Sequence, residues 1–227
     1  MTLKYEVRTK QTIDTINHLM DQGIKKIGVL IRHSDRFFSN DARLEPFMGL
    51  TDDGKTFAVD FGAAMGPDQM PKLYSSFLGR CVETAFLIDK GFTQKNNQVL
   101  DHNCMNPVLS PFYVKDITKA LPLIEDQGNE TFIRNWFDKR IDERIMESPE
   151  KTCDILSRFM KEQITSLKEN QIAVCVSHDW NIYPLKEFRL GLKHETAGQV
   201  GYLDGLVFFE NDSHDYITNY QMDPVLL

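Results

Sequence analysis

IGVLIRHSDR, residues 27 to 36, changes from an uncharged run to a polar one at Arg32. The run KIGVLI (26–31) is typical of a strand that is buried on both faces of a sheet. His33 follows it directly, and Arg36 lies three residues further along. Such a cluster indicates either the ordinary exit of a buried strand or the start of a ligand site at the edge of a sheet.

Helix-like and strand-like segments alternate on both sides of this stretch. The apolar spacing predicts helices over 12–23, 50–66, 80–92 and 148–170, and strands over 26–31, 72–76, 98–102, 172–177, 202–210 and 215–222, the last two as a hairpin. Thr51 is the expected N-cap of the second helix, and Gly91 the expected end of the third. The pattern predicts an α/β fold, with a mostly parallel sheet and helices on both faces.

The segment 103–147 departs from this alternation. Its first part has no regular spacing, and TFIRNWFDKRIDERIM (131–146) is expected to be helical with mixed charge. We therefore expect one domain over residues 1–227, with a helical lid or cap inserted at 103–147.

Composition limits the class of protein. Hydrophobic residues make up 41% of the chain, which is enough for a core, and the net charge of −7 argues against non-specific nucleic-acid binding. No run approaches the roughly 20 apolar residues of a membrane helix, and the N-terminus has no signal-like core. The cysteines have neither CxxC nor zinc spacing, so we expect reduced, mostly buried thiols: Cys81, Cys104, Cys153 and Cys175. These features favour a cytoplasmic protein that binds no membrane, although a processed secreted form would have the same composition.

Three predicted strands end in side chains that could bind an anion. Arg32 and His33 follow the first, Arg80 lies shortly after the second, and His178 and Asp179 follow the strand at 172–177. A lone histidine after a strand is more often structural. Because the carboxyl ends of parallel strands meet at one edge, the combination instead favours a binding site.

The residue types suit phosphoryl transfer. Arginine presents a fork of donors that matches two phosphate oxygens. A neutral imidazole can attack phosphorus, and a carboxyl group can donate a proton to the departing oxygen. No metal is needed, because the arginines supply the positive charge.

Four segments resemble the motifs of the histidine phosphatase superfamily, the group that includes phosphoglycerate mutases and histidine acid phosphatases. RHSDR (32–36) resembles the RHG signature in its acid-phosphatase form, and SHDWNIYPL (177–185) resembles the HD motif of that branch. Between them, LTDDGKTFAVDFG (50–62) resembles the LT-x-x-G helix, and SSFLGRCVETA (75–85) the S-x-x-x-R-x-x-x-T/S-A segment. The segments follow the order of the family.

The resemblance implies that His33 is the nucleophile and Asp179 the proton donor. It also implies that the phosphate is held by Arg32, Arg36, Arg80 and His178, without a cofactor. The mutase-like branch takes a glutamate donor from the segment after the third strand. Here that segment, DHNCMNP (101–107), has no glutamate, which favours Asp179 and the acid-phosphatase branch.

The chain departs from the family pattern at Ser34, which replaces a glycine, and at Phe37 and Phe38, where a proline is common. A Cβ at Ser34 could restrict the approach of a ligand to the backbone, or its hydroxyl could add a phosphate contact. The expected function is hydrolysis of a small-molecule phosphate monoester through a phosphohistidine. The alternatives are a mutase-like phosphotransferase and a catalytically weak phosphate-binding regulatory protein.

Other candidate residues have simpler explanations. Asp35 could be a pocket residue, but it is more simply expected to be an ion-pair partner that orients Arg36. Glu83 is expected to be a solvated helix residue more than an alternative acid. His102 could touch substrate or be structural. Trp180 is expected to wall the pocket, and Trp136 to pack the lid.

Overall fold

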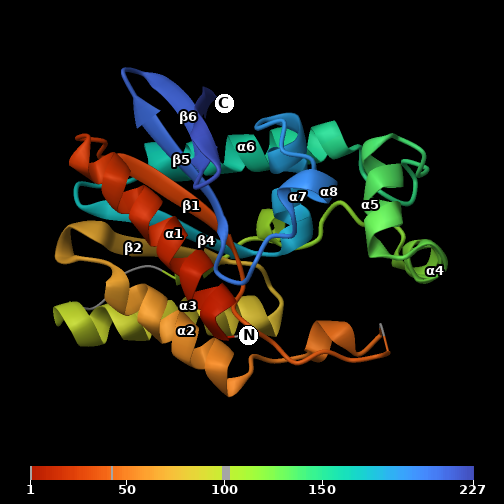
Figure 1. Cartoon of the computed structure of the whole chain (residues 1–227), viewed down its shortest axis with the longest axis horizontal. Coiled ribbons are helices and arrows are strands. Elements are labelled where there is room, and N and C mark those ends of the chain that lie inside the picture. The colour runs from red at the N-terminus through yellow and green to blue at the C-terminus, as the bar shows by residue number, and fades with distance from the viewer. Residues whose placement is uncertain (1, 42, 99–102) are drawn as a thin grey trace.

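The computed structural model describes residues 2–41, 43–98 and 103–227, with side chains from Thr9 onward. Its strands are β1 Lys26–Arg32, β2 Met70–Ser75, β3 Asn103–Met105, β4 Gln171–Ser177, β5 Gly205–Asn211, β6 His214–Asn219 and β7 Met222–Leu226. They form one sheet in the order β3-β2-β4-β1-β5-β6-β7 (Figure 1).

The sheet is parallel only at its centre and on the β3 side. β4 pairs in parallel with β1 and β2, and β2 pairs in parallel with β3, but β5, β6 and β7 join by antiparallel pairing. The prediction of a mostly parallel sheet was therefore wrong for the β5 side. The predicted hairpin is present as β5 and β6, whose turn residues Asp212 and Ser213 have φ values of 49° and 63°, the backbone of a tight hairpin turn.

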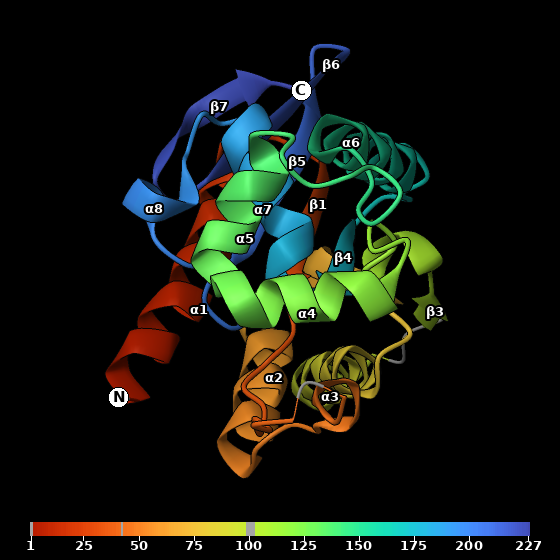
Figure 2. The same ribbon diagram turned by 90° about the vertical axis from the view of Figure 1, so that its right-hand side faces the viewer.

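Helices cover both faces of the sheet, as predicted. The described helices are α1 Thr2–Asp21, α2 Asp52–Ala64, α3 Gly79–Asn96, α4 Ile117–Gln127, α5 Asn129–Phe137, α6 Pro149–Thr165, α7 Asp179–Phe188 and α8 His194–Ala197. Three 3-10 turns are also present: η1 Glu45–Phe47, η2 Pro67–Gln69 and η3 Pro107–Leu109. One apolar cluster joins α1, α2 and α3 to one face, and a second joins α6 and α7 to the other and continues into α4 and α5 (Figures 1 and 2). No helix in the described part of the chain is long and apolar enough to cross a membrane.

The local sequence determines where α2 begins, but it does not determine where α3 ends. Thr51 caps α2 as predicted, because its Oγ1 accepts from the Gly54 backbone N–H at 3.0 Å. The predicted end of α3 at Gly91 was wrong, since the helix continues to Asn96. A Cβ on Gly91 would lie 1.9 Å from the carbonyl oxygen of Val59. This glycine therefore allows α2 and α3 to approach closely.

Two helices of ten residues or more were not predicted from the sequence, and neither was the short α8. α4 lies in a segment expected to be irregular, and α7 begins at Asp179, the second residue of the HD pair. Each contains an internal proline, Pro122 in α4 and Pro184 in α7, a residue that normally argues against a helix. The predicted strand 98–102 lies outside the described residues apart from Gln98, and β3 begins at Asn103.

The cysteines are free thiols in the structure. Cys81, Cys153 and Cys175 are buried, and Cys104 is exposed. The prediction of reduced, mostly buried cysteines is confirmed for this fold.

Candidate active site

The ends of the three central strands are tied together by their backbones. In register, Arg32 of β1 faces Ser177 of β4. Beyond the ladder, the backbone N–H of His33 donates to the carbonyl of Ser177 at 2.9 Å, and that of Ser76 donates to Val176 at 3.0 Å. The side chains that follow these strands consequently point into one region.

The His33 ring is held in a single orientation at this edge. The side chain is buried, and Nδ1 lies 2.8 Å from the carbonyl oxygen of Ser34. Because a carbonyl can only accept, Nδ1 carries the proton and Nε2 carries the lone pair. Arg80 Nε donates to that Nε2 at 3.0 Å. The lone pair of His33 Nε2 therefore accepts a hydrogen bond from a guanidinium group.

His178 lies beside this ring, with the two ring centroids 5.5 Å apart. Its Nδ1 is 3.5 Å from Nη2 of Arg80, which can only donate, and its Nε2 is 3.0 Å from Oγ of Ser76. The Cys81 sulfur is 3.5 Å from the same Nε2. Burial raises the pKa of the Cys81 thiol to about 12, so this sulfur stays protonated.

Burial and positive neighbours keep both rings neutral. The pKa of His33 lies well below its ordinary 6.5, first because of burial and then because of His178, Arg32 and Arg80. The pKa of His178 is lowered well below 6.5 by burial and then by the arginines. A neutral imidazole is the form that can act as a nucleophile.

This burial makes stability depend on pH. In the unfolded chain the pKa of His33 and of His178 returns to about 6.5, so the unfolded state binds more protons below that pH. We expect the free energy of unfolding to have its full value at about pH 7.5, where both rings are largely neutral in the folded and the unfolded state. As the pH falls through 6.5 it should decrease, by on the order of 2 kcal/mol at about pH 5.5, and it should level off below the folded-state pKa values. Urea unfolding at the two pH values measures the drop. A His178→Gln variant should show a smaller drop, and an equal one would contradict the assignment.

Arg32 and Asp179 form an ion pair beside the histidines. Arg32 Nη2 lies 3.1 Å from Oδ2 of Asp179, its Nη1 donates to the carbonyl of Val200 at 2.8 Å, and its Cζ is 4.3 Å from the ring centre of Tyr202. Its Nε is buried without a hydrogen-bond partner. Asp179 starts α7, and 25% of its side chain is exposed, so a ligand can reach it.

Arg36 reaches this group through a residue outside the motifs. Its guanidinium forms an ion pair with Glu45, and its Nε is buried without a partner. Arg80 Nη1 donates to the backbone carbonyl of the same Glu45 at 3.1 Å. The structure thus brings His33, Arg80 and His178 into direct contact. The ion pair of Arg32 and Asp179 lies beside them, with the Tyr202 ring against both Arg32 and His33. Arg36 joins this group through Glu45. Sequence reasoning missed Glu45, because it lies in an irregular loop with no motif around it.

Ser34 is bound to the two helices α2 and α3. Its hydroxyl donates to the carbonyl of Gly54 at 2.6 Å, and its backbone N–H donates to Oγ1 of Thr84 at 3.1 Å. A Cβ on Gly54 would lie 2.1 Å from the carbonyl oxygen of Asp35, so only glycine lets α2 pack this closely. Ser34 therefore fixes the segment that follows β1 to α2 and α3.

A Ser34→Gly variant should accordingly lose stability more than activity. It loses the bond to Gly54 and gains backbone freedom, which together cost on the order of 1 to 2 kcal/mol. We expect kcat to stay within about threefold, because the carbonyl that orients His33 remains. Urea unfolding and steady-state kinetics on the same preparation measure both effects. A large rise in activity would show that the Cβ obstructs the ligand.

The structure corrects the expectation for Asp35. Its Oδ2 accepts from the Thr51 hydroxyl at 2.9 Å, and its Oδ1 accepts from the backbone N–H of Arg36 at 3.0 Å. The ion pair of the Arg36 guanidinium is with Glu45, so the predicted partner was wrong. Glu83 is half-buried, with the backbone N–H of Leu50 3.4 Å from its carboxylate.

The two tryptophans lie on different helices, Trp180 on α7 and Trp136 on α5 itself. Trp180 stacks on Phe132 of α5, with ring centres 5.8 Å apart. Trp136 is buried beside Tyr113 and donates from Nε1 to the carbonyl of Glu147 at 2.7 Å. The candidate His102 lies outside the described residues.

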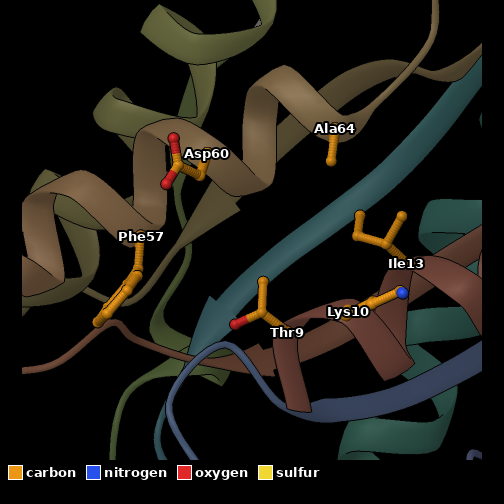
Figure 3. A pocket seen from close by; sticks show the side chains of 6 residues that line it. All are labelled: Thr9, Lys10, Ile13, Phe57, Asp60 and Ala64. Atoms are coloured by element: carbon orange, nitrogen blue, oxygen red, sulfur yellow. The ribbon is translucent and has the colours of Figure 1, made fainter. Parts of the chain in front are cut away.

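Two other features of the described chain do not form part of this group. Glu187, His194 and Glu195 offer possible metal ligands within 4.8 Å of one another, but Arg134 already binds both carboxylates. A hollow of about 210 Å³ lies between α1 and α2 (Figure 3). It is lined by Thr9, Lys10, Ile13, Phe57, Asp60 and Ala64, and it contains none of the predicted site residues.

Comparison with known proteins connects the fold to phosphatases. No protein-family model matches the chain, and no curated protein matches its sequence significantly. Mycobacterial glucosyl-3-phosphoglycerate phosphatase is similar in structure, with a TM-score of 0.56, 18% identity, and 88% of this chain and 96% of that chain covered. YhfR of Bacillus stearothermophilus has a TM-score of 0.52 at 16% identity, over 85% of this chain and 95% of its own. The similarity shows that these chains share a fold.

Proposed function

We propose that the protein is a phosphatase of the histidine phosphatase superfamily that hydrolyses a small-molecule phosphate monoester through a phosphohistidine on His33. One observation carries the proposal: the neutral His33 ring directs the unprotonated Nε2 at Arg80, with Arg32 and His178 beside it. The fold shared with a phosphatase that has also been solved in complex with VO3 supports the same reading.

In the first half of the reaction, Nε2 of His33 attacks phosphorus in line with the ester oxygen. The Nε2–P bond forms while the P–O bond to the alcohol breaks, and the proton of Asp179 passes to the departing oxygen. The buried, unpartnered Nε atoms of Arg32 and Arg36 are donors available to the phosphoryl oxygens. Those oxygens would replace Asp179 at Arg32 and so free the carboxyl group for proton transfer.

His178 can also bind the phosphoryl group. Its Nε2 faces the hydroxyl of Ser76, which can either accept or donate. If the hydroxyl donates, the proton of the ring moves to Nδ1, on the side of Arg80. Nδ1 then becomes a donor to a phosphoryl oxygen. In the second half, Asp179 as carboxylate takes a proton from water, whose oxygen bonds to phosphorus while the Nε2–P bond breaks. Inorganic phosphate leaves, and the electron pair of that bond returns to Nε2 of His33.

We place the leaving group beneath residues 103–147, acting as a lid. Trp180 follows Asp179 in the chain and stacks on Phe132 of α5, so this segment contacts the helix that carries the proton donor. α4 and α5 extend beyond the sheet on the same side as η1 (Figure 1). Side chains of this segment would then select the alcohol.

The test is phosphate release from an aryl phosphate in the presence of a chelator, between about pH 4 and pH 8. We expect turnover to continue in chelator, and a base-stable, acid-labile phosphoenzyme to be trapped on His33. Turnover that disappears in chelator would contradict the proposal. A diol monophosphate should yield inorganic phosphate, whereas an isomerised ester would indicate a mutase.

A further inference from the structure

The loop of residues 37–49 carries Glu45 to the site. The loop is closed at its base by the bridge between Arg36 and Leu50 and by the hydrogen bond from the backbone N–H of Phe37 to the carbonyl of Gly49, at 3.0 Å. Inside the loop, Oε1 of Glu45 accepts from the backbone N–H of Ser39 at 2.6 Å. This bond fixes one carboxylate oxygen and leaves the other for Arg36.

Glu45 occupies donors of two arginines that are candidates for holding phosphate. Its Oε2 forms the ion pair with Arg36, and its backbone carbonyl accepts from Nη1 of Arg80 at 3.1 Å. Arg80 in turn donates to His33. One loop residue therefore binds two of the cations around the nucleophile, with the oxygen types that a phosphoryl group would bring.

We propose that Glu45 competes with the phosphoryl group for Arg36 and Arg80, and thereby sets how tightly substrate and product phosphate are held. This inference rests on the proposed function. Only 12% of the Arg36 side chain is exposed, and a guanidinium this buried requires an anionic partner. Glu45 supplies that partner when no phosphate is bound. A phosphate dianion arriving at Arg36 meets a carboxylate of like charge, so Glu45 must withdraw.

The loop is built so that this withdrawal disturbs little of the core. No residue of η1 is buried, and Phe37, Phe38 and Phe47 are 58%, 68% and 79% exposed. Glu45 makes polar contacts with Ser39, Arg36, Arg80 and the backbone N–H of Met48. Segments with few buried apolar contacts open at low free energy.

A different role for Glu45 makes the opposite prediction. If the carboxylate only orients Arg36 toward the phosphate, its removal should weaken phosphate binding. If it competes, its removal should strengthen binding. The direction of the change in phosphate affinity therefore separates the two roles.

The experiment is calorimetric titration of the full chain with inorganic phosphate and with orthovanadate, comparing wild type, Glu45→Gln and Glu45→Ala. We expect both variants to bind phosphate with a Kd about tenfold lower, the change expected for loss of one competing charged contact. In turnover, KM and the inhibition constant of phosphate should fall by a similar factor. kcat should fall too, because product leaves more slowly.

Asp41→Asn is the matched control, because it removes one negative charge from the same loop. Asp41 binds the exposed Arg43, at 2.7 Å, instead of Arg36 or Arg80. The Asp41→Asn variant should bind phosphate with the same Kd as wild type. Weaker binding by both Glu45 variants, or an equal shift in Asp41→Asn, would overturn the inference. Tighter binding without turnover would sustain the inference while the proposed hydrolysis fails. No phosphate binding by any of the proteins would overturn both.

Discussion

Turnover of a phosphate monoester is expected to fall by at least about four orders of magnitude when His33 is replaced by alanine. No other described imidazole has its Nε2 hydrogen-bonded to Arg80, and a water molecule cannot form the covalent phosphoryl intermediate that the oriented His33 ring would form. Initial rates of phosphate release from an aryl phosphate, together with trapping of the phosphoenzyme, measure the loss. The cause would be removal of the covalent intermediate.

The control for this variant is His18→Ala. His18 is an exposed histidine of α1, whose ring lies 3.1 Å from the side-chain nitrogen of Gln22. Its loss should leave turnover unchanged. His33→Ala should still bind vanadate, because Arg32, Arg36 and His178 remain. Substantial turnover in His33→Ala, or a phosphoryl group trapped elsewhere, would refute the nucleophile assignment.

Asp179→Asn should be the second most damaging change, with a loss that depends on the leaving group. An alkyl alcohol leaves poorly without a proton, so kcat on an alkyl phosphate should fall by about 10² to 10⁴. An aryl phosphate with an acidic phenol leaves as its anion, so the loss there should be much smaller. The ratio of kcat/KM for the two esters, in wild type and variant, gives the effect of proton donation.

Glu83→Gln is the comparison that makes the Asp179 result specific. Glu83 is a half-buried carboxylate of α3 next to the 37–49 loop, and it accepts from the backbone N–H of Leu50 at 3.4 Å. Glu83→Gln should change kcat/KM by the same factor for the alkyl and the aryl phosphate. Full turnover of an alkyl phosphate by Asp179→Asn, or a larger loss in Glu83→Gln, would move the acid role away from Asp179.

The sequence predicted those parts of the fold that depend on local signals. β1 and β4 are runs of Val, Ile and Leu that need burial on both faces, and Thr51 with the acidic residues after it starts α2. α4 and α7 were missed because Pro122 and Pro184 contradict helix locally, whereas tertiary packing of Ala120 and Leu185 overrides that preference. β7 was missed because Pro224 breaks its pattern, which is tolerated on an edge strand.

The candidate site was predictable where it depends on strand ends and unpredictable where it depends on a loop. His33 and His178 meet because β1 and β4 are parallel neighbours, which apolar runs already suggested. The pairing of Arg36 with Glu45 depends on the path of the 37–49 loop, which no periodicity encodes. Asp35 was assigned the wrong partner for the same reason.

The strand order has a consequence for how the protein is made. β4, residues 171–177, lies between β1 and β2, although β2 (70–75) precedes it by about a hundred residues and β1 (26–32) by about 140. During synthesis, β1 and β2 must therefore wait with open edges until β4 leaves the ribosome, and such long-range pairing is slow. His33 is present early, but it meets His178 only after more than three quarters of the chain has been translated. The nascent protein would acquire its activity late and all at once.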